Sequence, residues 1–427
     1  MTVCIATSNY APHTGGIATC YGHLATLLTA AGHNVVVLVP AYDHSGSDTV
    51  NEENGITVVR LAATYHRYYK KYVRWFPSGG LDAATWIAAG KAMHEWLLNN
   101  RQQYTIDIIE TGDYGGLGVF LMDNNLPPVV ITGHGTFTQL SQYNVVKEDV
   151  QTRLVRELEE AALRHADGII AHSPANRQEL ETIAGKPVVL LAAPWQTGKG
   201  VKGTTGDYAI VAGGLQMIKG AAAMAEAVEK IVATHPGFQL YWIGGDTYTA
   251  PGAGKMSDYL ANQFPAIWGK QFAWLNELNH EETKAKISGA LLVIIPSAWE
   301  AFNYVALEAG EAGKAMVMTD KTGAAYMFTD KKDAWIVPVT RLAETITDIW
   351  EQKEKAAAIG EQAATTVEAF YNTHDAAAER ISYYKTVVAN NTPGKQPAAA
   401  TILNRYNRPG MIFYYSIKKM IKKMIGR

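Results

Sequence analysis

The chain has 427 residues, of which 48% are hydrophobic and 18% are charged, and its formal net charge at pH 7 is −2. A chain of this length is too long for one ordinary hydrophobic core and is typical of two α/β domains. The small net charge excludes a protein that binds nucleic acid through a global basic field. The two cysteines, Cys4 and Cys20, lack metal-ligand spacing and indicate a reducing compartment. We find no signal peptide and no apolar run long enough to span a bilayer, so we expect a cytoplasmic protein.

Short apolar runs alternate with helical stretches through the first half of the chain. This alternation predicts a doubly wound, parallel sheet, because each run is followed by a turn and a helical stretch. The longest of these stretches is a predicted helix from Glu148 to His165. The segments that we interpret as strands are Val3–Thr7, Val35–Val39, Ile56–Arg60, Ile106–Glu110, Val129–Thr132, Gly168–Ser173 with its turn, and Val188–Ala192.

A glycine-bearing loop, Tyr10–Ile17, joins the first predicted strand to a helix that should end near Ala31. Gly15 and Gly16 in this loop allow backbone N–H groups to approach a phosphate. The loop lacks the G-x-G-x-x-G order of a dinucleotide fold and the G-K-[ST] of a P-loop, which disfavours both alternatives.

The segment Tyr65–Phe76 contains six aromatic and four basic side chains in twelve positions. Aromatic rings among cations suit a membrane interface or an acceptor rich in sugar and phosphate. The alternative is a helix that packs its tyrosines on the sheet, and the sequence leaves both interpretations open.

A single histidine, His134, follows the predicted strand Val129–Thr132 inside a Gly-His-Gly-Thr turn. The carboxyl end of a strand is where open α/β sheets bind ligands, although a lone histidine is more often structural.

The segment Pro194–Gly206 is rich in Gly, Thr and Lys, which predicts a linker. A second series of strands follows it, and Gly213–Gly220 with Lys219 comes directly after the first of them. The predicted strands of this half are Tyr208–Ala212, Leu240–Ile243, Phe272–Leu275 and Leu291–Ile295.

Two acidic residues, Glu300 and Glu308, follow the buried strand Leu291–Ile295. Glu300 lies in a short turn and Glu308 in the helix after it, so both can reach one ligand at the carboxyl end of the strand. Carboxylates accept hydrogen bonds from hydroxyl pairs, and a helix N-terminus offers free N–H groups to a phosphate. The stretch therefore predicts a nucleotide-sugar site.

The C-terminal part begins with predicted helices at Ala356–Thr366 and Asp375–Val388 and a linker at Asn391–Ala400. In Met411–Arg427, apolar residues repeat at helical spacing and four lysines fill the other face, which predicts a basic amphipathic helix on an anionic membrane. The alternative is docking on the protein's own core. We treat 391–427 as a linker and tail.

The stretch Pro296–Asn303, followed by Leu307-Glu308-Ala309, resembles the E-x7-E motif of the retaining GT-B glycosyltransferases of family 4. The chain departs from the family at Ala301 and Asn303, where glycine is usual. The resemblance implies two facing doubly wound, Rossmann-like domains with a cleft between them. It further implies an acceptor-side domain at 1–197, completed by helix 375–388, and a donor domain at 207–371.

The same resemblance implies the roles of individual residues. Glu308 would bind the ribose, Glu300 and His134 the donor sugar, and Lys219 the diphosphate, which makes His134, Glu300 and Lys219 the catalytic set. Gly214 stands where the family has a second cation, an arginine. The implied donor-binding positions are Gly15, Gly16, Gly214, Lys219, Glu300, Phe302, Asn303, Glu308 and Gly323.

The expected activity is transfer of a hexose, with retention, from a UDP- or GDP-sugar to a glycan or lipid-linked acceptor in bacterial cell-surface polysaccharide or glycolipid synthesis. The resemblance implies neither a metal nor a cofactor. Two other functions stay open at this point: a nucleotide-sugar epimerase on the same architecture, and a nucleotide-sugar-binding protein whose active site has decayed, which the departures at Gly214, Ala301 and Asn303 motivate.

Overall fold

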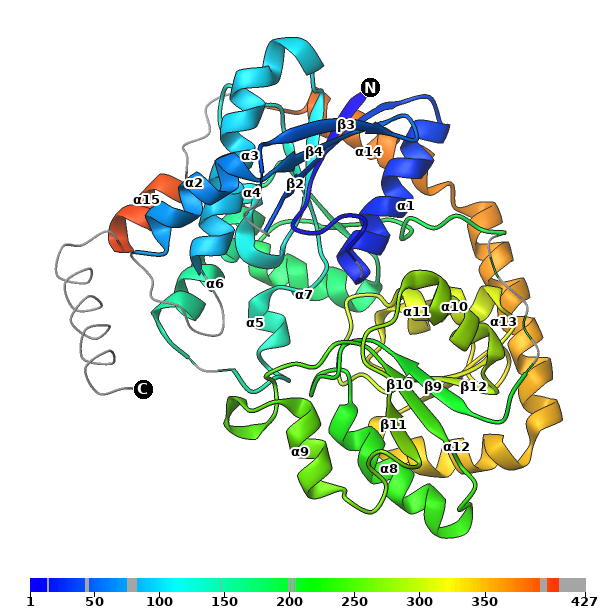
Figure 1. The fold of residues 1–427 in the computed structure, drawn as a ribbon. Helices are drawn as coiled ribbons and strands as arrows, with labels where there is room; N and C mark the ends of the chain where they lie inside the picture. Colours follow the sequence, from blue (N-terminus) through cyan, green and yellow to red (C-terminus); the bar gives the residue numbers. More distant parts are fainter. Residues whose placement is uncertain are drawn as a thin grey trace, which may run out of the picture.

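The computed structural model describes residues 1–13, 15–42, 46–74, 83–146, 148–198, 200, 203, 205–391 and 398–406. It confirms the predicted fold class, because two parallel-sheet, Rossmann-like domains lie one above the other in Figure 1. The chain crosses between them at the linker after residue 191 and again between α13 (Lys353–Thr373) and α14 (Ala376–Ala389), on the right of that view.

The first domain contains an eight-stranded sheet in the described part of the chain, in the order β3-β4-β2-β1-β5-β6-β7-β8. All neighbouring strands are parallel except β3, which runs antiparallel to β4. Strand β3 was not predicted from the sequence, because this edge strand is mostly exposed and lacks an apolar run. The strands are β1 (Thr2–Ala6), β2 (Asn34–Pro40), β3 (Thr49–Glu53), β4 (Ile56–Leu61), β5 (Ile108–Gly112), β6 (Val129–Thr132), β7 (Gly168–Ala171) and β8 (Val189–Leu190).

Helices cover both faces of this sheet (Figure 1). The predicted helix Glu148–His165 is α6, which starts two residues later because Asp149 forms a capping box before it. The helices of this domain are α1 (Gly16–Ala30), α2 (Ala63–Tyr72), α3 (Ala83–Tyr104), α4 (Gly118–Leu121), α5 (Phe137–Leu140), α6 (Val150–His165), α7 (Pro174–Ala184), α14, α15 (Ala398–Tyr406) and the 3-10 turn η1 (Tyr114–Gly116).

The second domain contains a six-stranded, parallel sheet in the order β11-β10-β9-β12-β13-β14 within the described residues. Its strands are β9 (Ala209–Ala212), β10 (Leu240–Ile243), β11 (Phe272–Trp274), β12 (Leu292–Ile295), β13 (Ala315–Thr319) and β14 (Trp335–Val337). Its helices are α8 (Ala221–Thr234), α9 (Met256–Gln263), α10 (His280–Gly289), α11 (Tyr304–Glu311), α12 (Leu342–Glu351) and α13, with the 3-10 turns η2 (Pro251–Ala253), η3 (Gly323–Met327) and η4 (Val339–Arg341).

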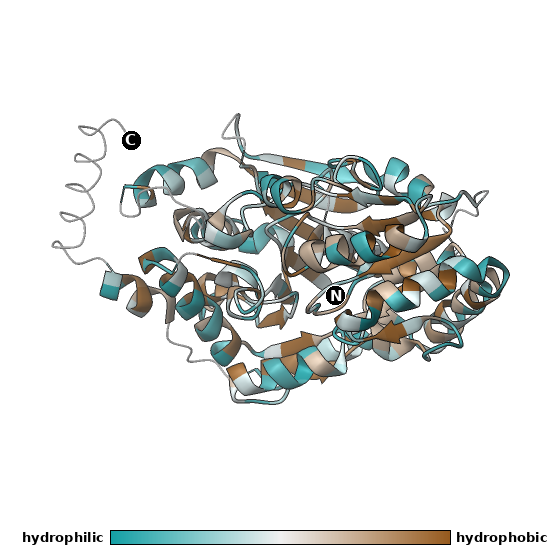
Figure 2. Ribbon diagram, turned by 90° about the horizontal axis from the view of Figure 1, so that it is seen from below, coloured by the Kyte–Doolittle hydropathy of each residue, from teal (hydrophilic) through white to brown (hydrophobic). Residues whose placement is uncertain are grey.

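The central strands are buried on both faces, as their continuous apolar runs predict. All four residues of β12 are buried, and Leu292 and Ile294 belong to one apolar cluster while Val293 and Ile295 belong to another. Figure 2 shows the consequence: hydrophobic strands form inner layers, and the helices around them carry both hydrophilic and hydrophobic residues. Each sheet therefore supports two cores, one on each face.

Strand order reverses between β1 and β5 in the first sheet and between β9 and β12 in the second. Open α/β sheets bind ligands outside the carboxyl ends of their strands at this switch point. Because the turns after the strands of the two sheets line one common cavity, both switch points open into the same space.

Helix α14 corresponds to the predicted helix Asp375–Val388 and packs against α1 in the first domain. Arg380 of α14 forms a buried ion pair with Glu110 of β5, with Nη1 2.7 and 2.9 Å from the two carboxylate oxygens and neither side chain exposed (0%). The Tyr384 hydroxyl donates to the same carboxylate. A helix from the C-terminal part of the chain thus completes the first domain.

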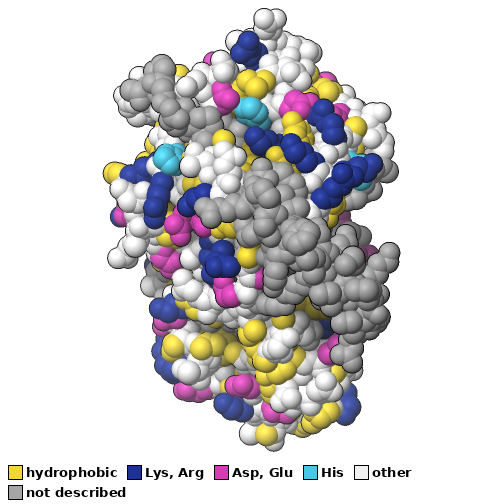
Figure 3. Space-filling view, turned by 90° about the vertical axis from the view of Figure 1, so that its left-hand side faces the viewer, with side chains coloured by type: hydrophobic (Ala, Val, Ile, Leu, Met, Phe, Trp, Pro, Cys, Tyr) yellow, Lys and Arg dark blue, Asp and Glu magenta, His cyan; other side chains and the backbone are white. Residues whose placement is uncertain are grey.

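The aromatic and basic segment Tyr65–Phe76 forms α2 up to Tyr72, and Trp75 and Phe76 lie outside the described residues. Tyr65 and Tyr72 are buried in the core of the first domain, which supports the packing interpretation for the tyrosines. The four cations of the segment, Arg67, Lys70, Lys71 and Arg74, stay exposed. Figure 3 shows the side of the molecule that is on the left in Figure 1. Lys and Arg side chains gather on its upper half, over the first domain.

The predicted linker Asn391–Ala400 is wrong at its end, because helix α15 begins at Ala398 and packs against α6 and α4. Burial of Ala399, Ile402 and Leu403 in the core of the first domain explains why this stretch is helical. The predicted amphipathic tail Met411–Arg427 lies outside the described residues. None of the described helices is long and apolar enough to cross a membrane.

Candidate active site

A cavity of about 570 Å³ lies between the two domains, within the range of small-molecule sites. Its walls come from the turns that follow β1, β6 and β7 of the first sheet and β9, β10, β11 and β12 of the second. Of the predicted site residues, it brings together Gly15, Gly16, His134, Gly214, Lys219, Glu300, Phe302, Asn303 and Glu308. Gly323 is not among the residues of its wall.

Glu300 is almost buried, with 10% of its side chain exposed, and its position is fixed by three donors. Lys219 Nζ, Ser297 Oγ and Asn303 Nδ2 lie 2.6, 2.8 and 3.0 Å from the same oxygen, Oε1. None of these three contacts uses Oε2, so this second oxygen remains for a hydrogen bond from a sugar hydroxyl.

The cation of the site is Lys219, which precedes α8 and pairs with Glu300 across the cavity wall. The position of the family's arginine, Gly214, carries no side chain, and the Gln216 amide lies nearest to it. Gln216 also lines the cavity. A neutral amide therefore occupies the space beside Gly214 where a second positive charge was expected.

His134 faces the cavity from the turn after β6, and its Nε2 atom is buried without a hydrogen-bond partner in the described structure. Burial and the positive charge of Arg380 lower the pKa of His134 to about 3. The ring is therefore neutral at physiological pH and suits hydrogen bonding to a sugar hydroxyl better than donation of a proton as a general acid.

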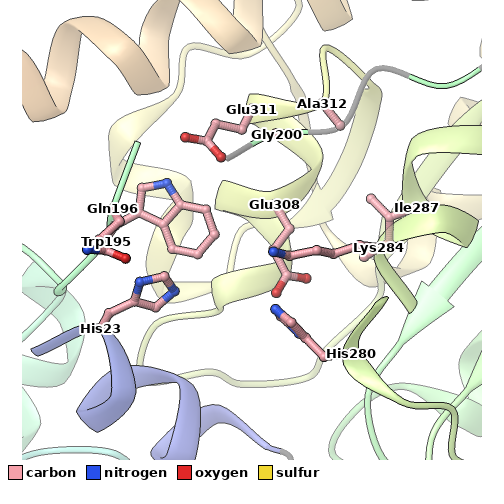
Figure 4. A pocket seen from close by; sticks show the side chains of 10 residues that line it. All are labelled: His23, Trp195, Gln196, Gly200, His280, Lys284, Ile287, Glu308, Glu311 and Ala312. Carbon is pink, nitrogen blue, oxygen red and sulfur yellow. The ribbon is translucent and has the colours of Figure 1, made fainter. Parts of the chain in front are cut away.

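Glu308 of α11 lies between the large cavity and a smaller pocket of about 30 Å³. Figure 4 shows its carboxyl group pointing toward the ring of His280, with the Lys284 side chain beside it. Burial raises the pKa of Glu308 to about 7, and the positive charge of Lys284 opposes this in part. The carboxyl group is thus poised to change charge near neutral pH.

The N-terminus of α1 reaches the cavity at Gly15 and Gly16. Gly15 has φ 120°, a conformation that residues other than glycine rarely adopt. Because the first N–H groups of a helix have no acceptor within it, this end of α1 can bind an anion that enters the cavity.

The departures from the family motif are accommodated locally. Asn303 caps α11, since its Oδ1 accepts from Val305 N at 2.9 Å, and its Nδ2 holds Glu300. Gly323 lies behind this loop, where an added Cβ would be 2.3 Å from the Ala301 carbonyl oxygen. The structure thus gives Gly323 a place in supporting the Glu300 loop from outside the cavity.

Two buried carboxylates that were not predicted from the sequence hold the turn of His134. Asp113 accepts from the backbone N–H groups of His134 and Gly135 at 2.9 and 3.2 Å, and burial raises its pKa to about 6. Glu159 accepts from Phe137 N at 2.9 Å, and burial raises its pKa to about 8. A charged residue among the apolar positions of α6 was the available signal for Glu159.

Two Rossmann-like domains, with a cavity between the carboxyl ends of their parallel strands, have the architecture of the GT-B fold. The family described as Glycosyltransferase Family 4 matches residues 14–191, and the family described as Glycosyl transferases group 1 matches residues 196–366. The chain therefore belongs to the GT-B glycosyltransferases of family 4.

Individual relatives agree with this assignment. Glycogen synthase of Mycobacterium tuberculosis is 26% identical over 334 residues, which cover 72% of this chain and 75% of the relative. Sucrose-phosphate synthase from Thermosynechococcus elongatus superposes with a TM-score of 0.71 at 19% identity, covering 91% of this chain and 100% of that structure. The catalytic domain of starch synthase IV from Arabidopsis thaliana, bound to ADP and acarbose, superposes with a TM-score of 0.64 at 14% identity. This match covers 91% of this chain and 99% of that structure.

Proposed function

We propose that this chain is a retaining, metal-independent hexosyltransferase that moves a sugar from a nucleoside-diphosphate sugar, UDP- or GDP-linked, to a glycan or lipid-linked acceptor. The observation that carries the proposal is the convergence of Glu300, Lys219, His134 and Glu308 on one cavity between the domains. Two carboxylates suit the hydroxyls of the sugar and the ribose, and the lysine suits the diphosphate.

The proposed chemistry follows from these positions. Lys219 and the free N–H groups at the start of α1 stabilise the negative charge that develops on the departing diphosphate, which is usually the largest single catalytic contribution. When the donor binds, Lys219 leaves its ion pair with Glu300 and pairs with the phosphate instead. Glu300 Oε2 holds a sugar hydroxyl and His134 lines the cavity beside the sugar, so that the anomeric carbon is presented to the acceptor.

Glycogen synthase among the relatives and the acarbose bound to starch synthase IV support a saccharide acceptor. We propose synthesis of a bacterial cell-surface polysaccharide or glycolipid in the cytoplasm as the setting. The free, buried thiols of Cys4 and Cys20 support a reducing compartment.

A panel of UDP-, GDP- and ADP-sugars tests the proposal. One donor should raise the melting temperature of the protein by mass action, and with an oligosaccharide acceptor and EDTA present it should give a product with the donor's anomeric configuration by NMR. Incubation with the donor alone should leave its sugar unchanged. An epimerised donor would indicate the epimerase, and uptake of no nucleotide at all would indicate a decayed site.

Donor affinity should rise about 10-fold between pH 6 and pH 8, because hydroxyl groups favour the ionised form of Glu308 and binding expels its proton. The pKa of Glu308 in the free protein, raised to about 7, places the change in this window. Affinity is lost as the pH falls below this pKa. Calorimetry with the donor identified above checks this, since its diphosphate does not titrate in this range.

The matched variant for this experiment is Glu308→Gln, which should bind more weakly but with a flat pH profile. A 2′-deoxy donor should also flatten the profile, since it lacks one of the two hydroxyls. An equally steep profile in Glu308→Gln would show that another group releases the proton.

We also propose that the basic amphipathic tail attaches the enzyme to the inner face of an anionic membrane. The exposed cations of α2 support a basic surface in the first domain. Liposome flotation should compare the full chain with a chain that ends after Tyr406, which keeps the packed helix α15. The full chain should float with anionic vesicles, and the shorter chain should float less; equal flotation would reject a role for the tail.

A further inference from the structure

Helix α7 of the first domain contacts the Glu300 loop of the second domain on both sides of Glu300. Ser173, at the N-terminus of α7, donates from Oγ to the Ala301 carbonyl oxygen at 2.7 Å. Glu179, two turns further along α7, accepts from Trp299 Nε1 at 3.0 Å. The residues directly before and after Glu300 in the sequence are thus held by one helix of the opposite domain.

Trp299 also joins this loop to the turn of His134. Its ring is buried and packs on Gly135, where an added Cβ would lie 3.1 Å from the nearest ring atom. Gly135 has φ 113°, so glycine suits both the backbone and the approach of the ring. The indole therefore lies beside the backbone that follows His134, while its own backbone leads into Glu300.

Glu179 holds both sides of this junction. Its second oxygen, Oε2, accepts from Gln139 Nε2 at 2.6 Å, and Gln139 forms the capping box of α5 with Thr136, two residues after His134. One carboxylate therefore connects the loop of Glu300 to the turn of His134 through two hydrogen bonds. A carboxylate, unlike an amide, can accept both with its two oxygens.

We infer that Glu179 is a positioning residue that couples closure of the two domains to the placement of Glu300 and His134 around the donor sugar. The inference rests on the proposed function for its kinetic consequence. Any separation of the domains would take Trp299 away from Glu179 and Gly135 and would break the contacts of the Glu300 loop with α7. In the arrangement of this structure, the same contacts align the loop and the turn.

Replacement Glu179→Ala should lower kcat about 10-fold, while the affinity for donor in the second domain changes less than about 2-fold, because the lost contacts align groups without touching the donor. Trp299→Phe, which removes the N–H donor and keeps a ring, should have a similar effect. The double variant should be little worse than either single variant, since both changes break the same link. Gln178→Ala, at an exposed position of the same helix, should leave kcat unchanged.

A second measurement needs no turnover. Spin labels at Arg101→Cys in α3 and Asn262→Cys in α9 are placed on exposed positions of the two domains, and the native thiols of Cys4 and Cys20 are buried. Pulsed EPR measures the distance between the two labels, with uridine or guanosine diphosphate bound to each protein. The distribution of this distance should be broader and should extend to longer distances in Glu179→Ala than in the parent. Glu179→Gln, which can accept only one of the two bonds, should fall between them.

Equal distance distributions in the parent and Glu179→Ala would overturn the coupling, whatever the catalytic activity. Multiplicative losses of kcat in the double variant would also overturn it, because they would show independent roles. Failure of every donor to react would refute the proposed function and leave the distance measurement to decide the structural inference by itself.

Discussion

Replacing Lys219 with alanine should lower kcat about 10²- to 10³-fold, the loss expected when a group that stabilises developing negative charge is removed. Lys219 Nζ lies 2.6 Å from Glu300, and the neighbouring Gly214 supplies no side chain to share the diphosphate charge. Donor affinity should fall about 10-fold or more, since a hydrogen bond to a charged group contributes about 1.5–3 kcal/mol. Steady-state kinetics and calorimetry check the two effects.

The fold should tolerate this change, because Glu300 keeps its hydrogen bonds from Ser297 and Asn303. Lys219→Arg should retain part of the activity, since it restores the charge in a different shape. Lys230→Ala, which removes an exposed lysine from α8, serves as the control and should behave as the parent. A Lys219→Ala enzyme within 2-fold of the parent would show that the diphosphate is held by other groups.

Replacing Arg380 with leucine should destabilise the protein by about 3–5 kcal/mol, because it leaves the charge of Glu110 buried without its partner. The pair has no exposed surface (0% on both sides), and the freed carboxylate would keep only neutral donors such as Tyr384 and Thr132. Urea unfolding should show this as an earlier first transition, in which the first domain loses its structure.

An exposed ion pair provides the comparison. Arg341→Ala removes the partner of Glu344. The Arg341 and Glu344 side chains are 52% and 62% exposed, and an ion pair this open to solvent contributes little to stability. Changing Glu110 and Arg380 together to leucine should recover part of the lost stability, because no charge then stays buried. If Arg380→Leu unfolds at a urea concentration no lower than Arg341→Ala does, the Arg380–Glu110 pair does not hold α14 in place.

The sequence predicted the parts of the site that depend on neighbouring residues. The buried strand β12, the turn with Glu300 and the helix with Glu308 are all local, and the apolar run and the spacing of the two acids indicate them directly. Lys219 follows a strand in the same way. The fold class followed from the alternation of strands and helices, and the structure confirms it.

The contacts that join the two domains could not be predicted. Glu179 and Trp299 are 120 residues apart in the sequence, and nothing near Glu179 distinguishes it from other acidic residues of helices. Asp113 accepts from backbone N–H groups, which leave no trace in the pattern of side chains. Glu159 does the same, and its place among the apolar positions of α6 is the only sign of it in the sequence. Edge strand β3 was missed because it shows no alternation of apolar and polar residues. The Ala-rich helix α3 was missed because its apolar residues do not form one regular helical stripe.

The position of α14 has a consequence for how the chain is made. Its Arg380 leaves the ribosome 270 residues after Glu110, the carboxylate that it neutralises. Until then, the nascent first domain carries an acidic group in its interior without a counterion, which should delay its final packing until α14 has been synthesised. A shortened gene that ends in the linker near residue 200 should therefore yield an unstable product, whereas co-expression of a second fragment that carries residues 205–391 should rescue it.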